Sequence, residues 1–182
     1  EGRISEGYMY MRPVGDRQAV KELLDQVEAG DNNIDELVEV LLQEGVDVER
    51  GFQIVLDSYG TCNSITTYET VVAHKSRTDQ RKVAQLLLDH VHAELLNNVK
   101  SDIVQRSESE PKETTLESLV ADREWLFGEH AYHIDTTHLA STTRFSRILE
   151  EEASLRKALD LTYYGRMLNS QFQYEGDEPF TD

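Results

Sequence analysis

Cysteine, proline and glycine are scarce in this sequence, which contains one, three and ten of them among its 182 residues. The single cysteine, Cys62, excludes an internal disulfide. This suits a protein of a reducing compartment such as the cytoplasm, and it also suits a cysteine-poor exported protein. Glycine and proline stand between periodic segments, and Leu, Glu, Gln, Lys and Ala dominate the segments themselves. Because these residues favour helices, the scarcity of helix breakers predicts an all-helical chain.

Long apolar runs and basic residues are also few. No apolar run approaches the roughly 20 residues needed to span a bilayer. Eighteen Lys and Arg stand against 35 Asp and Glu, which gives a net charge of −17. Such a chain repels polyanions, so we expect neither nucleic acid nor an anionic membrane as a partner. The first residues have neither an initiator Met nor a signal-peptide profile, so we expect a piece of a longer protein.

The periodic segments predict an all-α fold of stacked antiparallel helical hairpins, either an α-solenoid-like stack or an irregular helical bundle. We expect a single helical domain over residues 17–172, with an exposed polar loop at 106–113. Residues 1–16 show no helical period and are expected to form an extended N-terminal arm. Residues 173–182 are acidic and are expected to be a tail or linker.

Some helices can be placed from the spacing of apolar residues. The longest should run from about residue 78 to 105, on an apolar stripe formed by Val83, Leu87, Val91, Leu95, Val99 and Ile103. A first short helix should end at Gly30, where a left-handed C-terminal cap is expected, and a later helix should end at Gly60. The last helix should cover about 153–171, with one stripe formed by Leu155, Leu159, Thr162 and Leu168.

Three aromatic residues point to a repeat unit. Trp125, Tyr132 and Phe145 lie at separations of seven and thirteen residues, which resembles part of the tetratricopeptide-repeat pattern, around residues 122–150. The match covers one unit, and Gly128 lies one place before the position of that family's glycine. The resemblance implies a helical-hairpin scaffold that binds another protein or joins further helical repeats of its parent chain. It implies no ligand-binding residue.

Histidine is clustered in two short windows. With nearby carboxylates, these windows offer pairs of metal ligands three or four residues apart, formed from His90, His92, Glu129, His130, His133 and His138. An alternative hypothesis is therefore a metal-dependent helical-bundle enzyme that binds zinc, iron or manganese. The spacing differs from the His-Glu-x-x-His and Glu-x-x-His motifs, and carboxylates near histidine are expected by chance in an acidic chain.

Sequence signatures of other catalytic classes are missing. The chain has no glycine-rich phosphate loop, no Gly-x-Ser-x-Gly elbow and no cysteine-protease motif around Cys62. The leading hypothesis is accordingly a noncatalytic helical scaffold or protein-interaction domain without a cofactor. Homodimerisation through the helix at 78–105 is a further hypothesis.

The last third of the chain holds four arginines, Arg144, Arg147, Arg156 and Arg166, and several aromatic residues. Aromatic and arginine side chains are the usual anchors of protein interfaces, and here they suit an acidic or extended peptide. The candidate partner-binding residues are Trp125, Tyr132, Arg144, Arg147, Tyr163 and Arg166.

Overall fold

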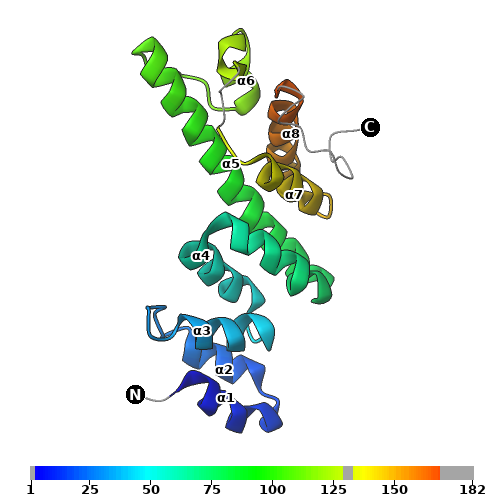
Figure 1. The fold of residues 1–182 in the computed structure, drawn as a ribbon. Helices are drawn as coiled ribbons and strands as arrows, with labels where there is room; N and C mark the ends of the chain where they lie inside the picture. The colour runs from blue at the N-terminus through cyan, green and yellow to red at the C-terminus, as the bar shows by residue number, and fades with distance from the viewer. Residues whose placement is uncertain (1–2, 129–132, 169–182) are drawn as a thin grey trace. The chain divides into compact units, whose positions relative to one another are not determined.

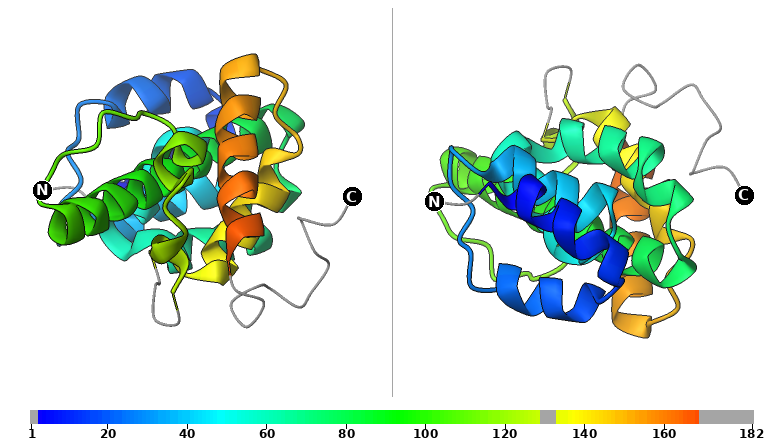
Figure 2. Two further views of the ribbon diagram at one scale, coloured as in Figure 1. Left: turned by 90° about the horizontal axis from the view of Figure 1, so that it is seen from above. Right: turned by 90° about the horizontal axis from the view of Figure 1, so that it is seen from below.

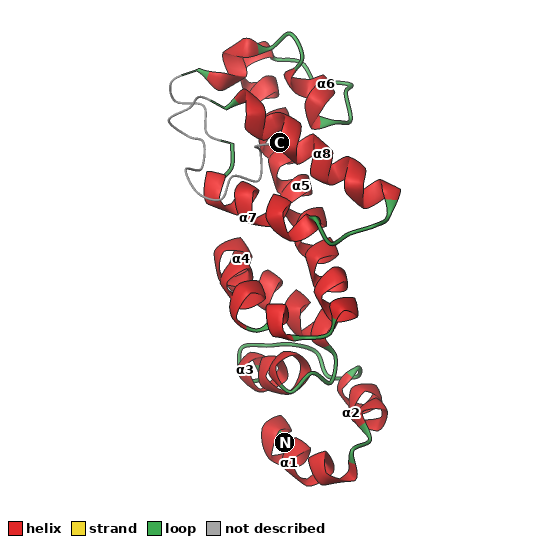
Figure 3. Ribbon diagram, turned by 90° about the vertical axis from the view of Figure 1, so that its right-hand side faces the viewer, coloured by secondary structure: helices red, strands yellow, loops and turns green. Residues whose placement is uncertain are grey.

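The computed structural model describes residues 3–128 and 133–168. Every regular element within these residues is a helix, so the predicted all-α class is confirmed (Figures 1 and 3). No helix in the described residues is both long enough and apolar enough to cross a membrane. The predicted acidic tail at 173–182 lies outside the described residues.

The chain divides into two compact units, residues 1–83 and 84–182, where the sequence had led us to expect one domain. The long central helix explains the difference. Its apolar stripe is continuous, so the sequence pattern shows no boundary, yet the contacts on either side of Val83 belong to different units.

The first unit is made of short helices followed by one long, broken helix. Its elements are α1 (Ile4–Met11), the 3₁₀ turn η1 (Arg12–Val14), α2 (Arg17–Leu24), α3 (Ile34–Val38), the π-helical turn η2 (Glu39–Gln43), α4 (Val48–Thr70), the 3₁₀ turn η3 (Val72–His74) and the start of α5 (Arg77–Ser107). The carboxylates of Asp16 and Asp47 accept the N–H groups of Ala19 and Arg50, so they cap the N-termini of α2 and α4.

One buried cluster of the first unit is aliphatic. Its members are Val20, Leu24, Leu37, Val40, Leu41, Val46 and Ile54. Helix α1, dark blue in Figure 2, contacts α3 and η2 and packs on this cluster through Ile4, Tyr8 and Met11. Residues 1–16 are therefore not the extended arm that we expected. These three side chains do have helical spacing, but the exposed Met9 and Tyr10 between them obscure the pattern in the sequence.

Two glycines shape α4. Gly60 has φ 76° and ψ −180°, so it breaks the helix where the sequence predicted an end, and a second helical segment follows directly. Gly51 lies where α4 approaches η2. A Cβ atom built on it would come within 2.7 Å of the backbone nitrogen of Leu42, so the close packing of these two elements requires glycine.

The second unit is built on the remainder of α5. That helix runs from Arg77 to Ser107, which confirms the helix predicted at 78–105. It is followed by α6 (Leu116–Val120), the 3₁₀ helix η4 (Glu124–Phe127), α7 (Thr136–Ser146) and α8 (Glu152–Met167). Helix α8 packs against both α6 and α7. The segment between α5 and α6 is largely exposed, in agreement with the predicted loop at 106–113.

Candidate functional site

Three polar side-chain pairs join α5 to α8 within the second unit: Gln85 with Ser154, Asp89 with Lys157, and His92 with Asp160. The residue numbers rise together along both helices, so the two helices run in the same general direction, as Figure 1 also shows. On each helix the three residues are three or four apart and therefore share one face. These pairs fix the register of α8 on α5.

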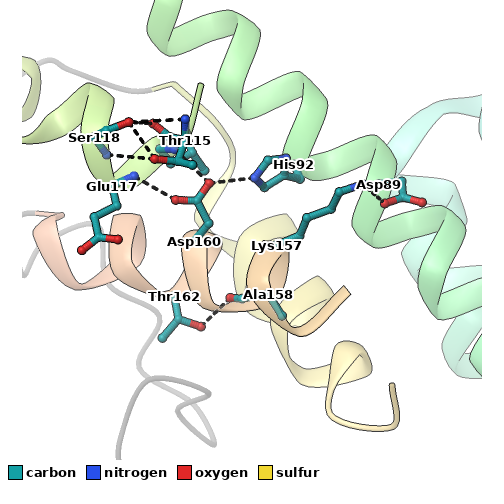
Figure 4. A network of polar contacts seen from close by, with 10 residues as sticks. Asp89, His92, Thr115, Glu117, Ser118, Lys157, Ala158, Asp160 and Thr162 are labelled. Carbon is teal, nitrogen blue, oxygen red and sulfur yellow. Dashed lines mark hydrogen bonds and ion pairs between the residues drawn. The ribbon is translucent and has the colours of Figure 1, made fainter. Parts of the chain in front are cut away.

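Asp160 makes the most contacts in this set. Its Oδ2 atom lies 2.8 Å from Nε2 of His92 and 2.8 Å from the backbone nitrogen of Leu116, and its Oδ1 atom lies 2.8 Å from the backbone nitrogen of Glu117 (Figure 4). The two backbone groups belong to the first turn of α6, whose N–H groups have no partner within the helix. One carboxylate thus connects α5, α6 and α8.

The charge of Asp160 is stabilised by these contacts. Burial of the side chain acts to raise the pKa of Asp160, but the hydrogen bonds from His92, Leu116 and Glu117 outweigh burial and hold the pKa below its ordinary value. The N-terminus of α6 is completed by Thr115 and Ser118, whose side chains each accept the other residue's backbone N–H (Figure 4).

A pocket of about 460 Å³ opens beside Asp160. Its lining comes from α5, the start of α6 and α8, and consists of His92, Thr115, Glu117, Arg156, Lys157, Leu159, Asp160 and Tyr163. None of these residues is Ser or Cys, and the Thr115 hydroxyl is hydrogen-bonded to Ser118. Leu159 and Tyr163 give the pocket an apolar wall, and Arg156 and Lys157 supply positive charge. The lining also holds two acidic side chains, Glu117 and Asp160, so the pocket is suited to an apolar side chain and has no excess of positive charge.

The outer face of α8 continues this apolar wall. Leu155, Leu159 and Met167 are 45%, 69% and 38% exposed, and Tyr163 is half-buried. These four residues follow one another at intervals of four, so they form one stripe along the helix. We call Leu155, Leu159, Tyr163 and Met167 the outer stripe.

The apolar stripe predicted for this helix was partly wrong. The sequence grouped Leu155 and Leu159 with Leu168, but the structure buries Leu161, Tyr164 and Leu168 and exposes the first two. Helix α8 carries apolar residues on two faces, and only the second of these faces packs into the unit.

Charge is distributed unevenly along the chain. Residues 136–168, which contain α7 and α8, hold five basic and four acidic residues, whereas the rest of the chain holds 13 basic and 31 acidic residues. The net charges are therefore +1 and −18. The outer stripe lies in a segment whose charges nearly balance, and residues 58–88 form a second such segment, with four basic and two acidic residues.

A second polar cluster is buried between α5 and α8. Nδ1 of His133 lies 2.7 Å from the Tyr164 hydroxyl, and its Nε2 lies 3.0 Å from Oδ2 of Asp102. A neutral imidazole protonated on Nε2 satisfies both contacts, since it donates to the carboxylate and accepts from the phenol. Burial, with a smaller contribution from Asp102, raises the pKa of Tyr164 well above its ordinary value. Because Tyr164 is fully buried, this cluster is a structural one.

The predicted metal ligands that lie within the described residues are held in separate contacts. His90 lies 3.9 Å from Glu94, and His92 and His133 have the partners described above. His138 contributes to lowering the pKa of Asp135, for which the hydrogen bond from Thr137 is the main cause. No group of three His, Cys, Asp or Glu residues suited to a metal occurs within the part of the chain that the structure describes. Glu129 and His130 lie outside that part, so the metal hypothesis stays a prediction.

The predicted partner-binding residues lie on several elements. Tyr163 lines the pocket, and Arg166 is exposed on the same helix. Trp125 is on η4 under the guanidinium of Arg106, with 5.3 Å between the guanidinium carbon and the ring centroid. Exposed Arg144 lies over the ring of Phe145, and Arg147 is exposed at the end of α7. Tyr132 lies outside the described residues.

Comparison of the chain with protein-family models, with curated proteins and with solved structures found no match. The chemistry of the pocket and of the outer stripe is therefore the guide to function.

Proposed function

We propose that this chain is a noncatalytic helical module that binds a protein partner on the outer stripe and in the adjoining pocket of α8. The observation that carries the proposal is the exposure of Leu155 and Leu159 beside a pocket that already has an apolar wall. Burial of a leucine side chain contributes about 1.5–3 kcal/mol, so two exposed leucines on one stripe offer a partner substantial binding energy. The tetratricopeptide-like segment around 122–150 remains a prediction that agrees with such a role.

The polar groups of the pocket support binding rather than catalysis. Both oxygens of Asp160 accept hydrogen bonds, and the donors include the two N–H groups that hold α6 in place. A carboxylate in this position is not free to remove a proton from a substrate. Its function is to keep α6 and α8 together, and it thereby maintains the shape of the pocket.

The test uses Leu159→Glu, with Leu23→Glu as a matched control. Leu159 and Leu23 are 69% and 65% exposed on helices of different units, so neither substitution disturbs a core. Proteins captured by the wild-type chain are identified and purified, and their dissociation constants are measured for all three chains. We expect Leu159→Glu to weaken binding at least about tenfold, or about 1.4 kcal/mol, because it places a charge in the apolar contact.

Leu23→Glu should leave the dissociation constant within about twofold of the wild-type value, because exposed positions outside a contact contribute little. Circular dichroism spectra should be the same for the three chains. If the purified partner binds Leu159→Glu as tightly as wild type, α8 is not the binding surface and the proposal fails.

A further inference from the structure

Helix α1 covers an apolar surface of the first unit without burying any of its own residues. We call this the α1-binding surface, and its buried residues are Val20 of α2, Leu37 of α3, and Val40 and Leu41 of η2. The side chains that α1 packs against this cluster share one face of the helix, and each is only half-buried. The structure therefore shows which kind of segment covers the surface, namely a short amphipathic helix.

The helical form of α1 depends on residues outside it. Its N-cap residue, Arg3, makes no side-chain hydrogen bond to the first turn, whose N–H groups have no partner within the helix. Glu36 of α3 supplies an acceptor instead, since its Oε2 atom lies 3.0 Å from the backbone nitrogen of Ser5. Isolated helices shorter than about 12 residues are marginal in water, and α1 has eight, one of them Gly7. Formation of α1 is therefore coupled to its docking.

The segment beneath α1 is strongly acidic. Residues 34–47, which contain α3 and η2, hold five acidic residues and no basic residue. Two of the five have partners on other elements, because Asp35 accepts the hydroxyl of Tyr59 and Asp47 pairs with Lys21. The other three carboxylates face α1.

These three carboxylates contact α1 at both of its ends. Glu36 and Glu39 accept the backbone N–H and the hydroxyl of Ser5, and the hydroxyl lies 2.6 Å from Oε2 of Glu39. Glu44 lies 3.4 Å from the guanidinium of Arg12, the residue that follows the last turn. A segment that takes the place of α1 therefore needs hydrogen-bond donors at its N-terminal end and a cation at its C-terminal end.

Helix α1 leaves part of the surface unfilled. A pocket of about 290 Å³ remains where Tyr8 and Met11 lie beside Val20. Arg17 and Asp16 also line this pocket, and their charges offset each other. Side chains that border a gap lose van der Waals contacts on that side. A helix with a larger apolar residue at the position of Met11 would therefore bind this surface more tightly than α1 does.

From the coupled helix, the carboxylates and the unfilled pocket we infer that the α1-binding surface binds an amphipathic helix of another protein, and that α1 is an internal ligand which this helix displaces. The partner helix has an aliphatic, an aromatic and a large apolar residue at the spacing of Ile4, Tyr8 and Met11, and a basic residue at the position of Arg12. A tethered segment acts at an effective concentration on the order of 1 mM, so the partner must bind more tightly than a free α1 sequence. The larger apolar residue supplies this difference.

The experiment measures binding of a fluorescein-labelled peptide of residues 3–16 that carries Met11→Trp. Fluorescence anisotropy gives its dissociation constant for the full wild-type chain and for the full chains with Tyr8→Asp and Tyr10→Asp. Tyr8→Asp places a charge against the apolar surface and releases the chain's own α1, so it should bind the peptide at least about tenfold more tightly than wild type. Tyr10 is 83% exposed on the opposite face, so Tyr10→Asp should stay within about twofold of wild type.

Substitutions in the peptide test the pocket and the carboxylates, with the Tyr8→Asp chain as the receptor. Compared with the unmodified peptide, Met11→Trp should lower the dissociation constant about fivefold, because it buries more apolar surface. Met9→Trp is the matched control, since Met9 is 70% exposed, and it should stay within about twofold. Arg12→Glu should raise the dissociation constant at least about fivefold, because it faces Glu44.

Displacement of α1 is measured on the wild-type chain, which needs no substitution. Saturation with the Met11→Trp peptide should make the Ile4–Met11 amides exchange faster with deuterium and leave the α4 amides unchanged. Peptide binding that leaves α1 protected, equal dissociation constants for Tyr8→Asp and wild type, or no binding to any chain would overturn the inference.

Two further outcomes place the inference. A wild-type dimer in sedimentation that dissociates on Tyr8→Asp would overturn it, because a second copy would then supply the helix. Leu159→Glu should bind the peptide as wild type does, since Leu159 belongs to the second unit. The inference is thus independent of the function proposed for α8, and either can fail while the other stands.

Discussion

At the scale of single residues, the carboxylate of Asp160 links three helices of the second unit. Three donors from two other helices converge on one carboxylate, and all three donor–acceptor distances are 2.8 Å. Hydrogen bonds to an ionised acceptor are shorter and stronger than bonds between neutral groups. The stability of α6, which has only five residues, therefore depends on a side chain that is more than 40 residues away in the sequence.

Asp160→Asn is expected to destabilise α6 at neutral pH. The amide keeps the shape of the side chain but replaces one acceptor oxygen with a donor, which then faces an N–H group. The expected loss is about 2 kcal/mol, the usual effect of a lost hydrogen bond to a charged group. Hydrogen exchange of the Leu116–Val120 amides measures this directly, and it should become faster in the variant than in wild type.

The pH dependence of this effect follows from the lowered pKa of Asp160. A carboxyl whose pKa is lower in the folded state than in the unfolded state stabilises the fold above its ordinary pKa, about 3.9, and the stabilisation is lost as the pH falls through the folded pKa. The difference between wild type and Asp160→Asn should therefore begin to shrink below about pH 4 and should close only below the lowered pKa of Asp160. Asp89→Asn removes the more exposed ion pair with Lys157, and it should lower the free energy of unfolding by less than about 1 kcal/mol. Equal exchange of α6 in both variants would contradict this role for Asp160.

At the scale of elements, much of the helix pattern could be predicted from the sequence. The long stripe of α5 and the break at Gly60 were both correct, because local spacing and backbone freedom decide them. For helix α8, local spacing could not decide which face is buried. Its sequence carries two apolar stripes, and the packing of the other elements of the second unit decides that Leu161 and Tyr164 are buried while Leu159 is exposed.

The candidate site was harder to predict than the helices. Tyr163 and Arg156 could be singled out because they lie in a segment of the sequence that is rich in aromatic residues and arginines. The contact between His92 and Asp160 spans 68 residues, and no local pattern signals it. Lys157 and Leu159 were missed for a similar reason, since a charged residue and a leucine on a helix are ordinary until the pocket between three helices is known.

The break in α4 gives a prediction at this scale. Gly60 has φ 76° with ψ −180°, a combination accessible essentially to glycine alone, and no other atom lies within 4 Å of a Cβ built there. Gly60→Ala should therefore cost about 1–3 kcal/mol through backbone strain and not through a clash. Chemical denaturation monitored by circular dichroism gives the free energy of unfolding.

Gly7→Ala is the matched control for this prediction. Gly7 also has no atom within 4 Å of a built Cβ, but it lies inside α1 in a regular helical conformation. Alanine there should stabilise the chain by up to about 1 kcal/mol, because glycine is the poorer helix former. If the two substitutions changed the free energy of unfolding in the same direction, the strain assigned to Gly60 would be wrong.

At the scale of the whole molecule, the histidines whose contacts the structure describes lie in separate structural contacts. In the second unit His92 joins α5 to α8, and His133 joins Asp102 to Tyr164 through both of its ring nitrogens. A metal ion at His133 would have to displace one of these hydrogen bonds, since an imidazole nitrogen cannot serve a metal and a proton at once. The geometry of the described residues thus favours the binding module over the metal enzyme.

Elemental analysis of untagged protein tests this choice directly. We expect zinc, iron and manganese to be well below one ion per chain, because His92 and His133 are already bonded to carboxylates and a phenol. The comparison is between wild type, a His130→Ala/His133→Ala double variant and His74→Ala, which changes a histidine of the first unit. Near-stoichiometric metal that is lost from the double variant and kept by His74→Ala would favour the enzyme hypothesis, since only a site formed with these two residues explains that pattern.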